Sequence, residues 1–212
     1  MATRARERLL DTAEELFYAE GIRAVGVERI VAESGVGRAS FYRHFASKDD
    51  LVVAVLRRRD EAWRAWLAER VAALGGEPLD VFHALAERFS RADFRGCAFI
   101  NTMAETADTG SPAYRVAAEH KESVTAYVAG LLADCGHPEA DELARRFVLL
   151  MDGAIVTALR ERTTAPAHEA RDVAAAMLGT GIPTRRSPGK RRPRPLPHAP
   201  GVNNPAESTN AP

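Results

Sequence analysis

The stretch that decides the fold is VERIVAESGVGRASFYRHFASKDDL, residues 27–51. Its spacing predicts a short helix over 27–34, a turn at Gly35 and a second short helix over 38–44. Glycine suits this turn because it enters the left-handed region of backbone space without steric cost. Val36 is placed to fill the apolar angle between the helices. The pattern is that of a helix-turn-helix, whose second helix is short enough to lie in a DNA major groove.

The two faces of the second helix differ in chemistry. Phe41 and Phe45 are four residues apart, so they share a face and are predicted to pack into the core with Ile30. The opposite face carries the hydrogen-bonding side chains that reading bases in a groove requires. The predicted DNA-binding residues are Arg38, Ala39, Ser40, Tyr42, Arg43, His44 and, at the next helix start, Lys48. Two helices of an ordinary bundle with a polar surface would show the same spacing, so the motif alone leaves both interpretations open.

Helical periodicity continues along the rest of the chain, and no segment alternates apolar and polar residues as a strand would. We therefore predict an all-α protein. Ser47 is predicted to cap a long helix whose positive first turn holds two aspartates. The predicted helices span 3–20, 27–34, 38–44, 47–74, 78–94, 97–107, 112–134, 138–162 and 166–178.

The segment 180–212 differs in composition from the rest of the chain. It holds eight of the 12 prolines, and six basic residues against one acidic residue give it a net charge of +5. The whole chain has a formal net charge of zero, so the remaining residues carry −5. Such a segment buries too little apolar surface to offset the entropy of ordering it, and we expect disorder. Two interpretations stay open: a solvated tail without further role, or a tether whose arginines contact DNA phosphates.

Several classes of protein and site are disfavoured by what the sequence lacks. No apolar run approaches the roughly 18–20 residues that a membrane span needs. The first residues, MATRARERLL, lack the apolar stretch of a secretory signal, so we expect a cytoplasmic protein with no membrane partner. The histidines show no metal-ligand spacing, and no nucleophile elbow or phosphate loop appears. We therefore expect no metal, no cofactor and no enzyme activity.

The head resembles the N-terminal domain of the TetR family of bacterial regulators. The resemblance runs from Leu9 to Leu51 and is carried by LFYAEG (16–21), SGVGRASFYRHF (34–45) and SKDDL (47–51). It implies a three-helix helix-turn-helix DNA-binding head, here over 1–46, and a divergent helical ligand-binding and dimerisation body, here over 47–179, which begins with a long fourth helix. It also implies phosphate contacts from Tyr42 and Lys48, and base contacts near Arg38, Ala39, Ser40, Arg43 and His44.

Two glycines depart from the family pattern. Gly26 stands where the family usually has a threonine that caps the second helix, and Gly37 where it usually has a serine or threonine that caps the recognition helix. Glycine is a tolerable cap but has no hydroxyl to offer a phosphate. We expect backbone N–H groups at these helix starts to take over that contact.

The most distinctive stretch of the body is FRGCAFINTMAETAD, residues 94–108. Its Gly-Cys…Asn…Glu pattern resembles a sub-group of TetR-like regulators, and Cys97, Asn101 and Glu105 share one helical face. One interpretation is a small-molecule pocket with the Asn and Glu as polar anchors; the other is a structural network in which they cap neighbouring backbone. The predicted pocket residues are Cys97, Phe99, Asn101, Met103, Glu105, Tyr127 and Met151.

A second apolar stretch, FVLLMDGAIVTAL over 147–159, is apolar on almost every side, so its helix must be buried on more than one side. One side is predicted to face the chain's own core. The other is predicted to face a second copy of the chain, with small residues allowing close approach. The predicted dimer interface residues are Phe147, Gly153, Ala154 and Ala158.

Together these features favour a homodimeric repressor that binds a double-stranded DNA operator and is released from it by a small-molecule effector. DNA and effector would favour different spacings of the two recognition helices. Two alternatives stay open. One is a regulator that senses oxidants or electrophiles through Cys97, which follows a glycine at a predicted helix start where a thiolate is favoured. The other is a constitutive DNA-binding protein with no effector.

Overall fold

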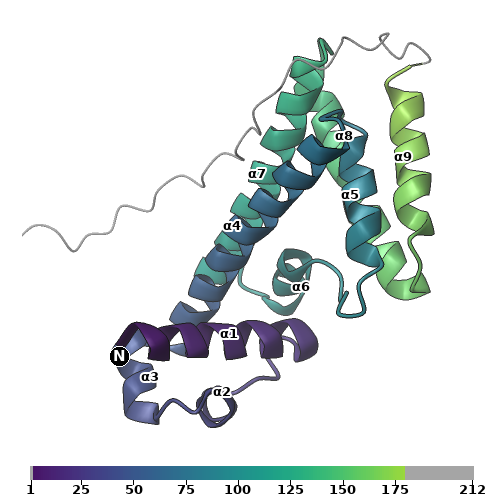
Figure 1. The fold of residues 1–212 in the computed structure, drawn as a ribbon. Helices are drawn as coiled ribbons and strands as arrows, with labels where there is room; N and C mark the ends of the chain where they lie inside the picture. The colour runs from purple at the N-terminus through teal and green to yellow at the C-terminus, as the bar shows by residue number, and fades with distance from the viewer. Residues whose placement is uncertain (1, 180–212) are drawn as a thin grey trace, which may run out of the picture.

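The computed structural model describes residues 2–179, so the segment 180–212 and its predicted disorder lie outside the described residues. The described part is all-α, as predicted, and no helix in it is both long and apolar enough to cross a membrane (Figure 1). Its helices are α1 Ala2–Glu20, α2 Val27–Ser34, α3 Arg38–His44, α4 Lys48–Leu74, α5 Asp80–Phe89, α6 Ala98–Glu105, α7 Pro112–Asp134, α8 Ala140–Glu161 and α9 Ala165–Met177.

The helices form a small head below a larger body (Figure 1). In the head, α1 packs against α2, α3 and the start of α4. The long helix α4 rises from the head beside α7, and α5, α8 and α9 complete the body. The short helix α6 packs on α7 and lies between body and head, close to α1.

The helix-turn-helix forms where the sequence predicts it. Gly35 has φ 63° and ends α2 in the left-handed conformation, which a residue with a Cβ would adopt only at a cost. Ile30, Phe41 and Phe45 are all buried, which confirms the predicted inner face of α3. The Ser47 hydroxyl accepts a hydrogen bond from the Asp50 N–H at 3.1 Å and caps α4 as predicted.

Two hydrophobic clusters make up the interior, and α4 contributes to both. The first half of α4, from Leu51 to Leu56, packs into the cluster built around α1, α2 and α3. The second half, from Leu67 to Val71, packs into the body cluster with α5, α7, α8 and α9. Body residues also complete the head cluster, because Phe99, Val116 and Ala117 are buried in it.

A buried polar network occupies the middle of α4, between the two clusters. The Asp60 carboxylate accepts hydrogen bonds from Arg64 Nε at 2.9 Å and from His120 Nδ1 of α7 at 2.7 Å. All three side chains are buried, and His120 is only 2% exposed. The imidazole stacks on the Phe99 ring of α6, with ring centroids 3.6 Å apart. Burial lowers the pKa of His120 below its ordinary value, against the raising effect of the Asp60 hydrogen bond.

The clearest difference from the predicted helices is at the end of α5. The prediction continues this helix to residue 94, but α5 ends at Phe89 and residues 90–97 form turns. Phe94 is nonetheless buried, with its ring centroid 4.9 Å from that of Phe89. The apolar spacing therefore reports burial correctly at Phe94, whereas the backbone that carries it is not helical.

Stability is expected to depend on pH through His120. The folded-state pKa lies below the unfolded value of about 6.5, so the unfolded chain takes up the proton first as the pH falls. The contribution of neutral His120 is therefore complete above about pH 6.5 and is lost as the pH falls toward the folded-state pKa. We expect urea unfolding at pH 7.5 and 5.5 to show a smaller loss of stability in His120→Gln than in the wild type.

His168→Gln is the matched control, because His168 is exposed on α9. It should lose as much stability between the two pH values as the wild type does. An equal loss in His120→Gln and the wild type would contradict the assignment of a neutral, buried imidazole.

Candidate nucleic-acid interface

The helix α3 presents its polar side chains outward while its aromatic side is anchored. Of the predicted DNA-binding residues, Arg38, Ala39, Tyr42 and Arg43 are exposed, and two more are half-buried: Ser40 and His44. The Tyr42 side chain is 47% exposed and meets the buried Phe41 ring edge-on, with centroids 5.1 Å apart. All six predicted residues on α3 are therefore at least partly exposed to solvent.

The charge on this surface is partly neutralised by α2. Arg38 Nη1 forms an ion pair with Glu28 Oε1 at 2.8 Å, and both side chains are more than 60% exposed. The Arg38 guanidinium also lies 5.8 Å from the centre of the Tyr42 ring. An exposed pair of this kind contributes about 0–1 kcal/mol, so Arg38 can exchange Glu28 for a phosphate or a base at little cost.

Lys48 has a structural contact that the sequence did not indicate. Its ammonium donates a hydrogen bond to the Ile22 carbonyl at 2.6 Å and lies 6.0 Å from the centre of the Phe17 ring. Lys48 is half-buried, so it ties the start of α4 to the turn after α1. An ammonium has three donors, so the same group could still reach a phosphate while holding this turn.

The two glycines precede α2 and α3 as their N-cap residues, at the positions that the sequence indicates. Gly26 and Gly37 both have extended backbone, and neither gives its helix a side-chain hydrogen bond. Any contact that a capping hydroxyl would make is therefore unavailable at both helix starts.

The predicted ligand pocket is not one cavity in the structure. Phe99 and Met103 pack with the head cluster, whereas Tyr127 and Met151 are buried in the body cluster. Cys97, at the start of α6, is half-buried and contacts both clusters. The apolar members of the predicted pocket look alike in sequence, but in the structure they belong to two separate cores.

A cleft does exist between head and body. It encloses about 380 Å³, counting its open mouth, and lies between α1, α4 and α6. From the predicted pocket it includes only Asn101 and Glu105. The other lining residues are Glu14, Phe17, Tyr18, Ile22, Val52, Val55, Leu56, Arg59, Ala98 and Thr102. The sequence could not indicate this cleft, because most of its lining comes from helices that carry the DNA-binding pattern.

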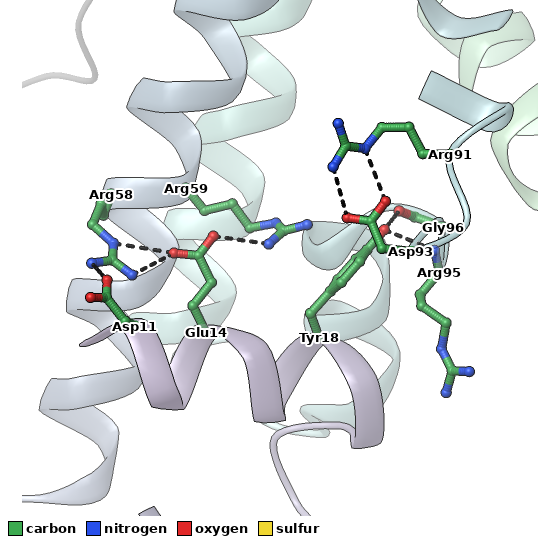
Figure 2. Close-up of polar contacts among 9 residues, drawn as sticks. All are labelled: Asp11, Glu14, Tyr18, Arg58, Arg59, Arg91, Asp93, Arg95 and Gly96. Carbon is green, nitrogen blue, oxygen red and sulfur yellow. Dashed lines mark hydrogen bonds and ion pairs between the residues drawn. The ribbon is translucent and has the colours of Figure 1, made fainter. Parts of the chain in front are cut away.

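The polar residues of the cleft are hydrogen bonded to their neighbours. Asn101 Nδ2 donates to the Arg95 carbonyl at 3.2 Å, and Glu105 Oε2 accepts from the Arg23 N–H at 3.0 Å. These are the backbone contacts of the structural-network interpretation. The Glu14 carboxylate of α1 bonds the guanidinium groups of Arg58 and Arg59 of α4 (Figure 2).

The predicted dimer interface needs correction. Phe147, Ala154 and Ala158 are buried within the chain's own core, so they are not available to a partner. Gly153 is exposed, with open space beside its Cα. The exposed large apolar side chains nearby are Leu149 and Val156 on α8 and Val173 on α9, at 73%, 54% and 50% exposure. Ala154 and Ala158 instead pack within the same chain, and only Gly153 of the predicted residues is exposed.

Comparison with known proteins finds two family matches along the chain. Residues 9–55 match the family described as bacterial regulatory proteins, tetR family. Residues 79–173 match the C-terminal domain described as transcriptional regulator LmrA/YxaF-like. Curated relatives include helix-turn-helix transcriptional regulators of Staphylococcus aureus, 40% identical over 53 residues. The match covers 25% of this chain and spans only 29% of the length of those relatives.

Solved structures extend the likeness to about four fifths of the chain. A TetR-family transcriptional regulator from Streptomyces coelicolor is 34% identical, with a TM-score of 0.74 over 83% of this chain and 95% of that one. A multidrug binding protein, EbrR, solved in complex with malachite green, is 26% identical, with a TM-score of 0.64 over 81% of this chain and 96% of that one.

Removing the carboxylate of Glu28 is expected to strengthen DNA binding. Glu28→Gln frees Arg38 from its ion pair and removes a negative charge beside the α3 face. We expect affinity for any duplex to rise a few-fold in a fluorescence anisotropy titration at low salt. Glu33→Gln is the control, because it makes the same charge change on α2 at a carboxylate that bonds Arg29. An equal gain in both variants, or none in Glu28→Gln, would contradict a DNA-facing Arg38.

Proposed function

The chain belongs to the TetR family of bacterial transcriptional regulators, and from this premise we propose that it is a homodimeric repressor that a small molecule releases from its operator. The observation that carries the proposal is the exposed face of α3, where Arg38, Tyr42 and Arg43 surround an aromatic anchor buried beneath them. A groove-binding helix needs this combination, because the anchor fixes its orientation and the polar tips contact bases and phosphates.

The dimer is supported by the outer face of α8 and α9. Leu149, Gly153 and Val156 follow one another at helical spacing, and Val173 of α9 adds a further exposed apolar side chain. Large apolar side chains exposed together favour burial against another surface. A two-fold pairing of α8 and α9 with their symmetry mates would bury this face and place the two heads on the same side of the dimer.

Release from the operator follows from the spacing of the two heads. Half-sites one turn of DNA apart require recognition helices about 34 Å apart. An effector that binds better to a conformation with another spacing shifts the population away from DNA. The relative solved with malachite green supports a small organic molecule as the effector class. In this chain the effector would act through α6, which lies between the body and α1.

Selection from a random duplex library is the direct test of operator binding. The full chain should enrich an inverted repeat whose half-sites lie about 10 base pairs apart. Arg43→Ala should lower preference for one base pair in each half-site, by about 1–3 kcal/mol, whereas Tyr42→Ala should weaken binding to all sequences alike. Placed within a promoter, the enriched site should lower reporter expression when the chain is present. Enrichment of no sequence, or a rise in expression, would refute a repressor.

Introducing a charged side chain into the proposed dimer face tests whether that face forms the interface. Leu149→Glu puts a carboxylate into the proposed interface and should convert the dimer into a monomer at micromolar concentration in sedimentation equilibrium. Leu74→Glu, a partly exposed leucine at the far end of α4, is the control and should leave the dimer intact. A Leu149→Glu protein that remains dimeric would place the interface elsewhere.

A further inference from the structure

The start of α6 is attached to the head through Tyr18 of α1. The Tyr18 hydroxyl accepts a hydrogen bond from the Arg95 N–H at 2.8 Å and donates one to the Gly96 carbonyl at 3.1 Å (Figure 2). The Arg95 guanidinium returns to donate to the carbonyl of Ala19, the next residue of α1. One hydroxyl thus uses both its donor and an acceptor on the backbone that leads into α6.

Gly96 is suited to this contact by its backbone. It has φ +81°, in the left-handed region, and a Cβ added there would come within 3.2 Å of Leu159 Cδ2. A side chain at this position would therefore be strained and crowded. The glycine of the Gly-Cys…Asn…Glu pattern lets the chain turn so that its carbonyl faces Tyr18.

The end of α6 is attached to the head through Glu105. Its Oε2 accepts from the Arg23 N–H at 3.0 Å, in the turn between α1 and α2. The carboxylate also lies against Gly21, where an added Cβ would be 2.9 Å from Glu105 Oε1. Asn101, halfway along α6, donates to the Arg95 carbonyl and so holds the loop that meets Tyr18.

We propose that Gly96, Asn101 and Glu105, together with Tyr18, form a clamp that fixes the head relative to the body and so positions α3 for the operator. The proposal rests on the operator binding proposed above. It assigns the Gly-Cys…Asn…Glu pattern to positioning rather than to direct contact with an effector.

The packing around the clamp explains why it positions the head. On the body side, α6 packs against α7, and Phe99 of α6 stacks on the buried His120. On the head side, the clamp holds α1, which packs directly against α2 and α3. On its other side α1 bonds α4, where Arg58 and Arg59 bond Glu14 and Arg58 also bonds Asp11, and it shares the head cluster with the first half of α4. The clamp adds a second attachment through α6, and without it the contacts with α4 alone set the orientation of the head.

A free head should affect operator and random DNA differently. Two heads bind an operator only when their recognition helices match the half-site spacing, so a broader range of orientations lowers affinity. Binding to random DNA rests on phosphate contacts that need no fixed spacing. The ratio of the two affinities therefore reports on positioning.

The test compares Tyr18→Phe and Glu105→Ala with two matched variants. Tyr114→Phe removes a hydroxyl from a half-buried tyrosine of α7 outside the clamp. Glu105→Gln keeps a side-chain oxygen that can accept from the Arg23 N–H. We expect Tyr18→Phe and Glu105→Ala each to lose about tenfold in affinity for the selected operator, with random DNA binding and the thermal midpoint unchanged. Tyr114→Phe and Glu105→Gln should bind the operator as the wild type does.

Equal losses on operator and random DNA with a lower thermal midpoint would show a merely structural role and overturn the proposal. Unchanged operator affinity in both clamp variants would overturn it as well. Amide hydrogen exchange separates this failure from failure of the proposed function, because it needs no DNA. The Arg95 amide should exchange faster in Tyr18→Phe and the Arg23 amide faster in Glu105→Ala, even if the wild type selects no operator. Unchanged exchange at both amides would show that the clamp does not hold the head.

Discussion

The structure depends on one helix that belongs to two hydrophobic cores. At 1.5 Å per residue, the 27 residues of α4 extend about 40 Å, and about 30 Å of this separates Leu51 in the head cluster from Val71 in the body cluster. Because a packed helix moves as a rigid unit, repacking at one end must reorient the other. The head and body are thus joined by one continuous helix rather than by a flexible linker.

The middle of α4 carries charges where an apolar seam would be the simpler solution. Burying Asp60, Arg64 and His120 costs desolvation energy, and the geometry must offset it with hydrogen bonds that no shifted register could make. The same imidazole stacks on Phe99, so the network fixes the first turn of α6, while Tyr18 holds the loop before the helix and Arg23 holds its last residue. The short helix is therefore connected to α1, α4 and α7 at once, and these contacts would carry the proposed coupling between effector binding and DNA binding.

Much of this architecture is readable from the sequence, and the failures have definite causes. The head was predictable because the spacing of Ile30, Phe41 and Phe45 places them on one inner face, and because Gly35 and Ser47 are local signals that act without tertiary context. Periodicity does not say which of two apolar surfaces a residue meets. It therefore placed Ala154 and Ala158 against a partner when they pack within their own chain.

The contacts between the body and the head could not be predicted from the sequence either. Glu105 and Arg23 are 82 residues apart, and the Tyr18 hydroxyl bonds backbone groups, which carry no residue-specific signal. Helical spacing showed that Asn101 and Glu105 share a face, but it could not decide between a ligand and a backbone partner for them. The sub-group suggested by that pattern stays a prediction.

Because Phe99, Val116 and Ala117 complete the head cluster, the boundary of the head in space is not its boundary along the chain. A chimaera that joins residues 1–46 to the body of another regulator would leave that cluster uncovered and would separate Tyr18 and Arg23 from their partners on α6. The segment that must be exchanged as one piece in such a chimaera is therefore larger than residues 1–46. The first half of α4, the loop before α6, α6 itself and the first turns of α7 must be transferred together with the head, because all of them contact it.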